Sequence, residues 1–277
     1  MTLESIPLAG VIGDPIAHSK SPLLHGHWLK TMGLPGHFVP LEVKADDLGA
    51  VLKAMPKMGF VGCNVTIPHK ERVMQFVDQI TDRATLIGAV NTLIFREDGS
   101  ILGDNTDGYG FIENLKQGAP EWNSKAGPAV VLGAGGAARA VVASLLDAGV
   151  PEILLTNRTR VRSDKLREDF GARVKVFEWV QAGNIVEEAH TLVNTTSLGM
   201  AGKAELRVPL DGLRSETLVT DLVYNPLRTA LLEAAAAKGC VTVDGVGMLL
   251  HQAVPGFERW FGERPTVDLA TRQAVLA

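Results

Sequence analysis

The chain has 277 residues, of which 46% are hydrophobic and 21% charged, and it carries a net charge of −4. This composition is typical of a globular protein of one or two domains with a substantial core. The acidic balance argues against a nucleic-acid or membrane-surface partner. The first residues lack a basic region and no apolar run is long enough to span a bilayer, so we expect a cytoplasmic protein.

Segments typical of strands and helices alternate along most of the chain, which favours an α/β fold with mainly parallel sheets. In the first half we expect strands over residues 8–12, 38–43 and 59–65, and helices over residues 21–32, 46–55 and 68–77. Pro68 places the third helix, because proline suits the first helical position. Further along we expect a hairpin of residues 90–95 and 100–102 around Asp98-Gly99, a helix over 109–116 and a domain linker over 118–128.

The most specific motif follows that stretch. Residues 129–139 (AVVLGAGGAAR) join a short apolar strand to a glycine turn and an alanine-rich helix. Gly133 permits the tight turn, Gly135 lets the backbone approach a pyrophosphate, and the small Ala138 allows close packing of the helix on the sheet. The alternative is a glycine turn that binds nothing, but the order of strand, turn and helix favours a dinucleotide site.

The next strand, residues 152–156, indicates which dinucleotide binds. It ends at Asn157-Arg158-Thr159, where an NAD site usually carries an acidic residue that accepts hydrogen bonds from the ribose. Asn157 does not repel a 2′-phosphate, and an arginine fork can hold one, so we expect NADP. Arg160 and Arg162 follow. The alternative for Arg160 is that it does not contact the phosphate and only keeps the loop solvated.

Strands over residues 191–194, 218–222 and 241–243 complete a second sheet. Thr195 follows the first of them and is expected beside the cofactor, although side-chain to backbone hydrogen bonds could equally explain that turn. Cys63 and Cys240 lie in apolar segments and are expected to be reduced core thiols. No cluster of histidine, cysteine and carboxylate has metal-ligand spacing, so no metal site is expected.

Three loops of the first half carry unusual polar residues at strand ends, where ligands bind in open α/β sheets. They are residues 13–22, 64–70 and 103–108. Together they offer hydroxyls, amides, one lysine and one carboxylate, a set that suits a small polyhydroxylated acid.

At these residues the chain resembles the shikimate dehydrogenase family. The matching segments, in the family's order, are residues 16–22, 64–70, 88–92, 105–108, 133–139, 157–159 and 247–253. The resemblance implies NADP-dependent interconversion of 3-dehydroshikimate and shikimate, on the route to chorismate and aromatic amino acids. It also implies two α/β domains with an active-site cleft between them. These are a substrate-binding catalytic domain over residues 1–105, to which helices of residues 246–277 return, and a Rossmann-like NADP-binding domain over 106–245.

The resemblance further implies roles for individual residues, with Lys70 and Asp107 as the catalytic pair. The implied substrate contacts are Ser19, Ser21, Thr66, Asn91 and Gln252, with Asn64 and Tyr224 as weaker candidates. The implied cofactor contacts are Gly133, Ala134, Gly135, Gly136, Ala137, Asn157, Arg158, Thr159, Arg162, Thr195, Gly245 and Met248.

The reaction chemistry supports the catalytic pair. Hydride transfer to a ketone carbon leaves the oxygen in need of a proton, so a general acid must lie within hydrogen-bond reach. With Pro68 as the first helical residue, Lys70 would lie in the first turn of a helix, where the dipole disfavours its charge. A nearby Asp107 would favour that charge, so the two are treated as coupled.

Each of these residues also has a structural explanation. The alternatives are a helix cap for Ser21 or Thr66, an Asx-turn for Asp107, a surface charge for Lys70, a strand end for Asn91, a polar helix position for Gln252 and core filling for Met248. For the whole protein, two alternatives stay open. One is a dehydrogenase that also accepts quinate or NAD, and the other is a binding module that senses the substrate without turnover. For the assembly, the hypothesis is a homodimer.

Overall fold

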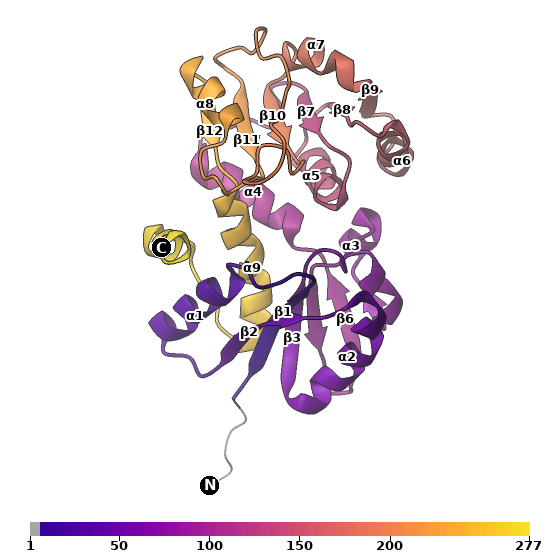
Figure 1. The fold of residues 1–277 in the computed structure, drawn as a ribbon, viewed down its shortest axis with the longest axis vertical. Helices are drawn as coiled ribbons and strands as arrows, with labels where there is room; N and C mark the ends of the chain where they lie inside the picture. Colours follow the sequence, from indigo (N-terminus) through magenta and orange to yellow (C-terminus); the bar gives the residue numbers. More distant parts are fainter. Residues whose placement is uncertain (1–5) are drawn as a thin grey trace. The chain divides into compact units, whose positions relative to one another are not determined.

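The computed structural model describes residues 6–277 and divides into two compact units (Figure 1). The first unit runs to Thr106 and includes Leu249–Ala277, and the second comprises Asp107–Met248. The prediction of a linker over residues 118–128 was wrong, because this stretch belongs to the second unit. Its side chains hold it there: Trp122 Nε1 donates to Thr191 Oγ1 (3.0 Å) and Ser124 Oγ donates to the Ala148 carbonyl (2.6 Å).

The sheet of the first unit has the strand order β2-β1-β3-β5-β6-β4. Its strands are β1 (Leu8–Gly13), β2 (His37–Glu42), β3 (Phe60–Val65), β4 (Gln79–Ile80), β5 (Thr92–Phe95) and β6 (Ile101–Asp104). β1 pairs in parallel with β2 and β3, whereas β5 is antiparallel to β3 and to β6. The expected hairpin is confirmed: Gly99 has φ +81, a value that its turn between β5 and β6 requires.

The helices of the first unit come from both the N-terminal and the C-terminal parts of the chain. They are α1 (Ser21–Met32), α2 (Leu48–Ala54), α3 (Asp82–Ile87), α10 (Leu269–Leu276) and the part of α9 (Val246–Phe261) that follows Met248, with short 3-10 turns at Ala45–Asp47, Met55–Met58 and Arg72–Phe76. Trp260 on α9 donates from Nε1 to the Leu93 carbonyl (3.0 Å), and Trp28 on α1 donates to Thr271 Oγ1 on α10 (3.3 Å). The first bond ties α9 to the sheet, and the second ties α10 to α1.

The helix expected over residues 68–77 does not form. The chain makes a turn after β3, through a cis Ile67-Pro68 peptide, and only Arg72–Phe76 is helical, as a 3-10 turn. The His69 side chain is fully buried, and its Nε2 lies 2.7 Å from the Val43 carbonyl oxygen. The His69 amide also donates to the Thr66 carbonyl (2.9 Å). These contacts outweigh the local preference of proline for a helix start.

The second unit contains a fully parallel sheet in the order β12-β11-β10-β7-β8-β9. Its strands are β7 (Ala129–Leu132), β8 (Ile153–Thr156), β9 (Val174–Phe177), β10 (Thr191–Asn194), β11 (Leu218–Asp221) and β12 (Val241–Val243). From β7 the chain adds β8 and then β9 on one side. It then adds β10, β11 and β12 in turn on the other side of β7. The strand order therefore reverses between β7 and β10, the point where doubly wound sheets bind nucleotides.

Helices pack on both faces of this sheet, so its four central strands are buried (Figure 1). One core contains residues of α4 (Asp107–Gly118), α5 (Gly136–Asp147) and α6 (Arg160–Phe170), and the other contains residues of α7 (Ala182–Val186) and α8 (Ala230–Ala237). Cys63 and Cys240 are free and buried, as expected. Within residues 6–277, no helix is long and apolar enough to cross a membrane, and no group of three histidine, cysteine or acidic side chains could hold a metal ion.

Candidate functional site

The glycine turn of the second unit has the geometry of a phosphate cradle. β7 ends at Leu132, and Gly133 turns the chain with φ +110 while its amide donates to the Thr156 carbonyl (2.8 Å). Gly135 then precedes the first residue of α5 and provides no side-chain cap. A Cβ atom on Gly135 or Gly136 would meet nothing within 4 Å, so the space beside the helix N-terminus is open. This space and the uncapped amides fit the pyrophosphate of a dinucleotide.

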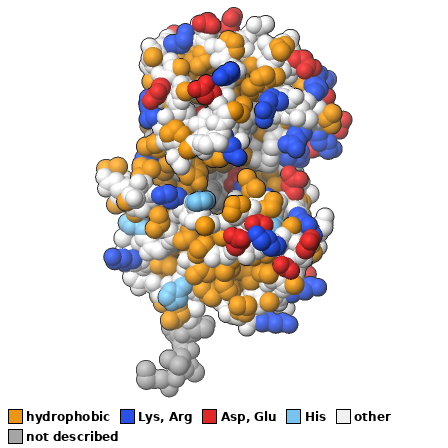
Figure 2. Space-filling view, in the orientation of Figure 1, with side chains coloured by type: hydrophobic (Ala, Val, Ile, Leu, Met, Phe, Trp, Pro, Cys, Tyr) orange, Lys and Arg blue, Asp and Glu red, His pale blue; other side chains and the backbone are white. Residues whose placement is uncertain are grey.

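The end of β8, beside this turn, carries one side-chain amide and exposed arginine side chains. Asn157 donates from Nδ2 to the Thr159 carbonyl (2.9 Å), which shapes the loop, and Arg158 and Arg162 are exposed. Arg160 instead pairs with Asp164 (3.1 Å) and with Glu178, which supports the structural explanation for that residue. Figure 2 shows Lys and Arg side chains gathered on the side of the second unit where α6 lies. The exposed Arg158 and Arg162 suit contact with a 2′-phosphate, and that contact stays a prediction.

The turn after β10 lies against the glycine turn. Thr195 Oγ1 donates to the Leu132 carbonyl (2.8 Å), and a Cβ on Gly133 would fall 2.6 Å from the same hydroxyl oxygen. The buried Asn194 accepts from the Thr196 amide (3.0 Å) and hydroxyl (2.8 Å). Side-chain to backbone bonds therefore stabilise this turn, as the alternative explanation held. They also place Thr195 at the edge where the cofactor is expected.

Three further predicted residues belong to the second unit. A Cβ on Gly245 would lie 2.4 Å from the Leu222 carbonyl oxygen, so close backbone packing explains this glycine. Met248 is half-buried and packs against the core that contains α4 and α5. Tyr224 is 37% exposed, and partial burial raises the pKa of its phenol. The expected contacts of these residues with ligands stay predictions.

In the first unit, a buried hydrogen-bond network joins residues that are far apart in the sequence. Asn91 donates from Nδ2 to Gln252 Oε1 (3.1 Å), and its Oδ1 accepts from the Thr106 amide (2.9 Å). Thr106 Oγ1 in turn donates to the Gln252 carbonyl (2.8 Å). Asn64 on β3 donates from Nδ2 to the Asn91 carbonyl (3.2 Å), while its buried Oδ1 has no hydrogen-bond partner. The network brings together three predicted substrate contacts, Asn64, Asn91 and Gln252.

The other predicted substrate contacts of the first unit, Ser19, Ser21 and Thr66, lie on two adjoining loops or, for Ser21, at the start of the helix that follows one of them. The Asp14 amide donates to the Ile67 carbonyl (3.1 Å), and the Thr66 amide donates to the Ile12 carbonyl (2.9 Å). A Cβ on Gly13 would fall 2.6 Å from Thr66 Cγ2, so these loops approach closely. The loop after β1 also carries Ser19, whose Oγ accepts from the Ser21 amide (3.3 Å).

The helix-cap explanation for Ser21 and Thr66 was wrong. Ser21 is the first residue of α1, and the preceding Lys20 makes no side-chain cap. Thr66 precedes a turn and no helix. Capping therefore does not account for either hydroxyl, and their contacts with a ligand stay predictions.

Lys70 lies half-buried in the turn after β3, and its carbonyl accepts from the Val90 amide (2.8 Å), next to Asn91. Because no helix starts at Pro68, the expected effect of a helix dipole on Lys70 does not apply. Asp107 is buried and is the first residue of α4, directly after Thr106 of the network. Lys70 belongs to the first unit and Asp107 to the second, so their coupling stays a prediction.

Several polar residues around these positions were not predicted from the sequence. They are the buried Asp104 and Thr92 with the exposed Arg83 in the first unit, and the buried Asp221 in the second. Asp221 accepts from Asn194 Nδ2 (2.9 Å) and Thr229 Oγ1 (2.7 Å), and burial raises the pKa of its carboxyl. A carboxylate at the end of an apolar strand was the available signal for both Asp104 and Asp221. Their partners come from later or earlier segments and left no local pattern.

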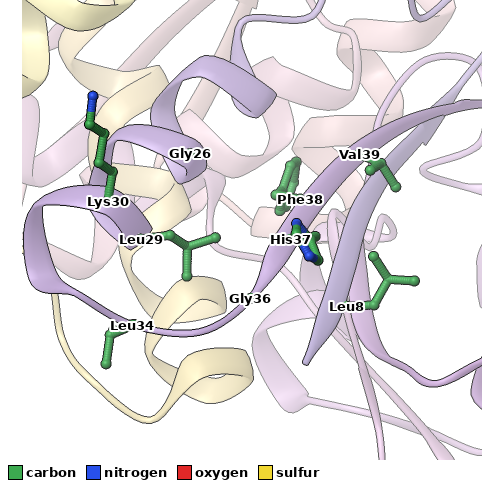
Figure 3. Close-up of a pocket in the computed structure, with 9 residues that line it drawn as sticks. All are labelled: Leu8, Gly26, Leu29, Lys30, Leu34, Gly36, His37, Phe38 and Val39. Carbon is green, nitrogen blue, oxygen red and sulfur yellow. The ribbon is translucent and has the colours of Figure 1, made fainter. Parts of the chain in front are cut away.

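A separate pocket of about 580 Å³ lies between α1 and β2 (Figure 3). Its lining is Leu8, Gly26, Leu29, Lys30, Leu34, Gly36, His37, Phe38 and Val39. None of the predicted site residues lines it, so it is distinct from the polar network.

Comparisons with known proteins match the chain to one family. Three family descriptions match: shikimate dehydrogenase substrate binding domain (residues 11–93), shikimate/quinate 5-dehydrogenase (115–201) and shikimate 5′-dehydrogenase C-terminal domain (245–276). A relative from Roseobacter denitrificans named shikimate dehydrogenase (NADP(+)) is 68% identical, with 100% of both chains covered.

Two solved structures extend the likeness to the fold. Shikimate 5-dehydrogenase from Thermus thermophilus, in complex with NADP(H) and shikimate, is 37% identical with a TM-score of 0.87, covering 98% of this chain and 99% of that one. Quinate dehydrogenase from Corynebacterium glutamicum, in complex with NAD, is 30% identical with a TM-score of 0.90, covering 97% and 98%.

Proposed function

This chain belongs to the shikimate dehydrogenase family, and on that premise we propose that it catalyses the reversible, NADP-dependent reduction of 3-dehydroshikimate to shikimate. The observation that carries the proposal is the combination of two features in one chain. The second unit has an open glycine turn followed by a strand end without an acidic residue, and the first unit has a buried network of amides and hydroxyls. A nicotinamide dinucleotide and a small hydroxylated acid are the ligands that these features suit.

The second unit holds the cofactor. The α5 amides and the open side of Gly135 receive the pyrophosphate, and Arg158 with Asn157 receives the 2′-phosphate. The bound cofactor supplies the hydride. Arg162 is a second cation near the same end of β8, and Thr195 supports the turn from β10.

The first unit holds the substrate and supplies the proton. Ser19 and Ser21 bind the carboxylate, while Thr66, Asn91 and Gln252 bind hydroxyls of the ring. Lys70 gives a proton to the oxygen of the ketone as the hydride arrives, and Asp107 orients and balances the ammonium group. In the oxidation direction Lys70 takes the proton back from the same oxygen.

A steady-state assay of the purified protein tests this function. Shikimate and quinate are each offered with NADP and with NAD, and reduced cofactor is measured by its absorbance. We expect shikimate with NADP to give the highest kcat/KM by at least about tenfold, since one lost charged contact alone has that effect. Comparable rates with quinate would favour the activity named for the Corynebacterium structure. Binding of shikimate without turnover would identify a sensing module.

For the setting of the reaction we propose the cytoplasm, which the two buried free thiols of Cys63 and Cys240 support because such thiols persist in reducing compartments. We propose a homodimer as the assembly, and light scattering of the eluted protein tests it.

A further inference from the structure

We propose that Asp104, clamped by Arg83 and Thr81, is a positioning residue. It fixes the positions of the substrate-binding network and of residues 105–106, which lead into Asp107. The inference rests on the proposed function, because it assigns a catalytic consequence to the position of Asn91 and Thr106. The contacts on which it rests lie within the first unit, which ends at Thr106, directly before Asp107.

The clamp is a buried carboxylate with four donors. Arg83 Nε donates to Asp104 Oδ1 (2.7 Å) and its Nη2 donates to Oδ2, so the guanidinium holds both oxygens. Thr81 Oγ1 and the Asn105 amide each donate to Oδ1 (2.7 Å). The Asp104 side chain is 3% exposed, whereas that of Arg83 is 51% exposed. The arginine therefore reaches from the surface to a carboxylate that water barely touches.

Both donor side chains come from the start of one helix. Thr81 is the N-cap of α3 and accepts from the Ala84 amide (3.4 Å), and Arg83 lies in the first turn. The Thr81 amide donates to the Gly103 carbonyl (3.0 Å). The helix start is thus fixed against the end of β6, and the two oxygens of Asp104 have one orientation.

From Asp104 the contacts lead to the network. The Asp104 carbonyl accepts from the Asn91 amide (3.0 Å), and Asn105 Nδ2 donates to the Ala89 carbonyl (2.9 Å). Between these, the Val90 amide donates to the Lys70 carbonyl (2.8 Å). Residues 89–91 therefore connect the backbone of Lys70 to the segment that runs from Asp104 through Thr106 into Asp107.

The charge of Asp104 fits a permanent clamp. Burial alone would raise the pKa of this carboxyl, but hydrogen bonds from Arg83 and Thr81 outweigh it and hold the pKa below the usual range. Asp104 consequently stays ionised throughout the pH range of an assay, so it acts by holding geometry. A displacement of about 1 Å at a reacting group can lower a rate by about 100-fold.

Kinetics of four variants test the proposal. Arg83→Met removes the guanidinium, and Arg83→Lys keeps the positive charge without the two-pronged guanidinium. Asp104→Asn removes the negative charge of the carboxylate, and Arg83→Met/Asp104→Asn removes both charges. We expect kcat for shikimate oxidation to fall about 10- to 100-fold in Arg83→Met, with the KM for NADP within about twofold because the cofactor residues belong to the other unit. Arg72→Met is the matched control, since Arg72 pairs with the exposed Asp46 in the same unit, and its kcat should stay at the wild-type value.

The double variant separates positioning from stability. It leaves no unpaired buried charge, so its melting temperature should recover relative to Arg83→Met, while its kcat stays low. Arg83→Lys should recover part of the kcat. If the double variant regains both melting temperature and kcat, the pair is only structural and the proposal is overturned.

A readout without turnover keeps the proposal separate from the proposed function. Amide hydrogen exchange at Asn91 and Thr106 should speed up in Arg83→Met and stay unchanged in Arg72→Met. If the wild-type protein does not oxidise shikimate with NADP, the proposed function fails while the exchange result still decides whether the clamp holds these amides. Unchanged exchange at both amides in Arg83→Met would overturn the clamp.

Discussion

Gly133 and Thr195 approach each other so closely that a Cβ on Gly133 would fall 2.6 Å from the Thr195 hydroxyl oxygen. The glycine also has φ +110, which side chains rarely adopt. Gly133→Ala should therefore destabilise the protein, by about 1–3 kcal/mol as is usual for a strained backbone position, and thermal unfolding measures the loss. An unchanged melting temperature would contradict this prediction, because it would mean that the turn at Thr195 moves aside without loss of stability.

Gly135→Ala provides the matched comparison for cofactor binding. A Cβ there meets nothing within 4 Å, so the melting temperature of the free protein should not change. The same methyl group would occupy the space assigned to the pyrophosphate, so the dissociation constant for NADP should rise, measured by fluorescence titration. Normal NADP affinity in this variant would show that the pyrophosphate does not lie beside Gly135.

Lys70→Ala tests the proposed proton donor. Its kcat should fall by about 10²- to 10⁴-fold, the usual effect of a positioned acid or base, while the KM for shikimate changes much less. Steady-state kinetics in both directions measure the split. A near-normal kcat with a greatly raised KM would indicate that Lys70 only binds the substrate.

Asp107→Asn tests the coupling of the second catalytic candidate. It should lower kcat, because a neutral amide would replace the carboxylate that is proposed to orient the ammonium of Lys70. Steady-state kinetics with shikimate and NADP measure the change. An unchanged kcat would restrict Asp107 to a structural role.

Arg158→Ala tests the choice of cofactor, with Arg160→Ala as its control. Arg158 is exposed at the end of β8, whereas Arg160 is already paired with Asp164 and Glu178. Loss of one charged hydrogen bond should lower the preference for NADP over NAD by about 10- to 100-fold. The ratio of kcat/KM values for the two cofactors measures it. Equal losses with NADP and NAD, or an equal effect of Arg160→Ala, would contradict the assignment.

Ser21→Ala tests whether this hydroxyl binds the substrate. Because Ser21 is the first residue of α1 and not its cap, the loss of about 1 kcal/mol expected for a missing cap should not appear in thermal unfolding. The KM for shikimate should rise by about 10- to 100-fold if the hydroxyl binds the carboxylate. Loss of stability with an intact KM would restore a purely structural role.

His25 should make the first unit sensitive to acid. Its ring is fully buried and stacks on Phe38 at 3.8 Å, and burial lowers the pKa of His25 to about 3. Below pH 6.5 the unfolded chain binds a proton that the folded chain does not, so stability present above pH 6.5 is lost as the pH falls toward 3. The free energy of unfolding should fall by up to about 1.4 kcal/mol per pH unit from this group. His25→Phe should flatten that slope in chemical denaturation, and an identical slope would contradict the prediction.

Local sequence was sufficient for the features that depend on a residue's own backbone or on immediate neighbours. Asp98-Gly99 predicted the hairpin because the turn needs a positive φ that glycine adopts freely. The glycine turn after β7 and the strand end at Asn157 were predicted for similar reasons, since a strand, a turn and a helix follow one another there without interruption. Short apolar segments located most strands of both sheets, whereas β4 and β9 were not predicted.

Only the tertiary structure decided what the remaining polar residues do. His69 reaches the Val43 carbonyl and the chain turns where Pro68 predicted a helix, because a buried contact outweighs a local propensity. Asn91 and Gln252 are 161 positions apart, and Arg83 and Asp104 are 21 apart. Such pairs form when the fold brings distant segments together in a place that excludes water, where a polar group needs a partner. Sequence spacing carries no trace of that requirement.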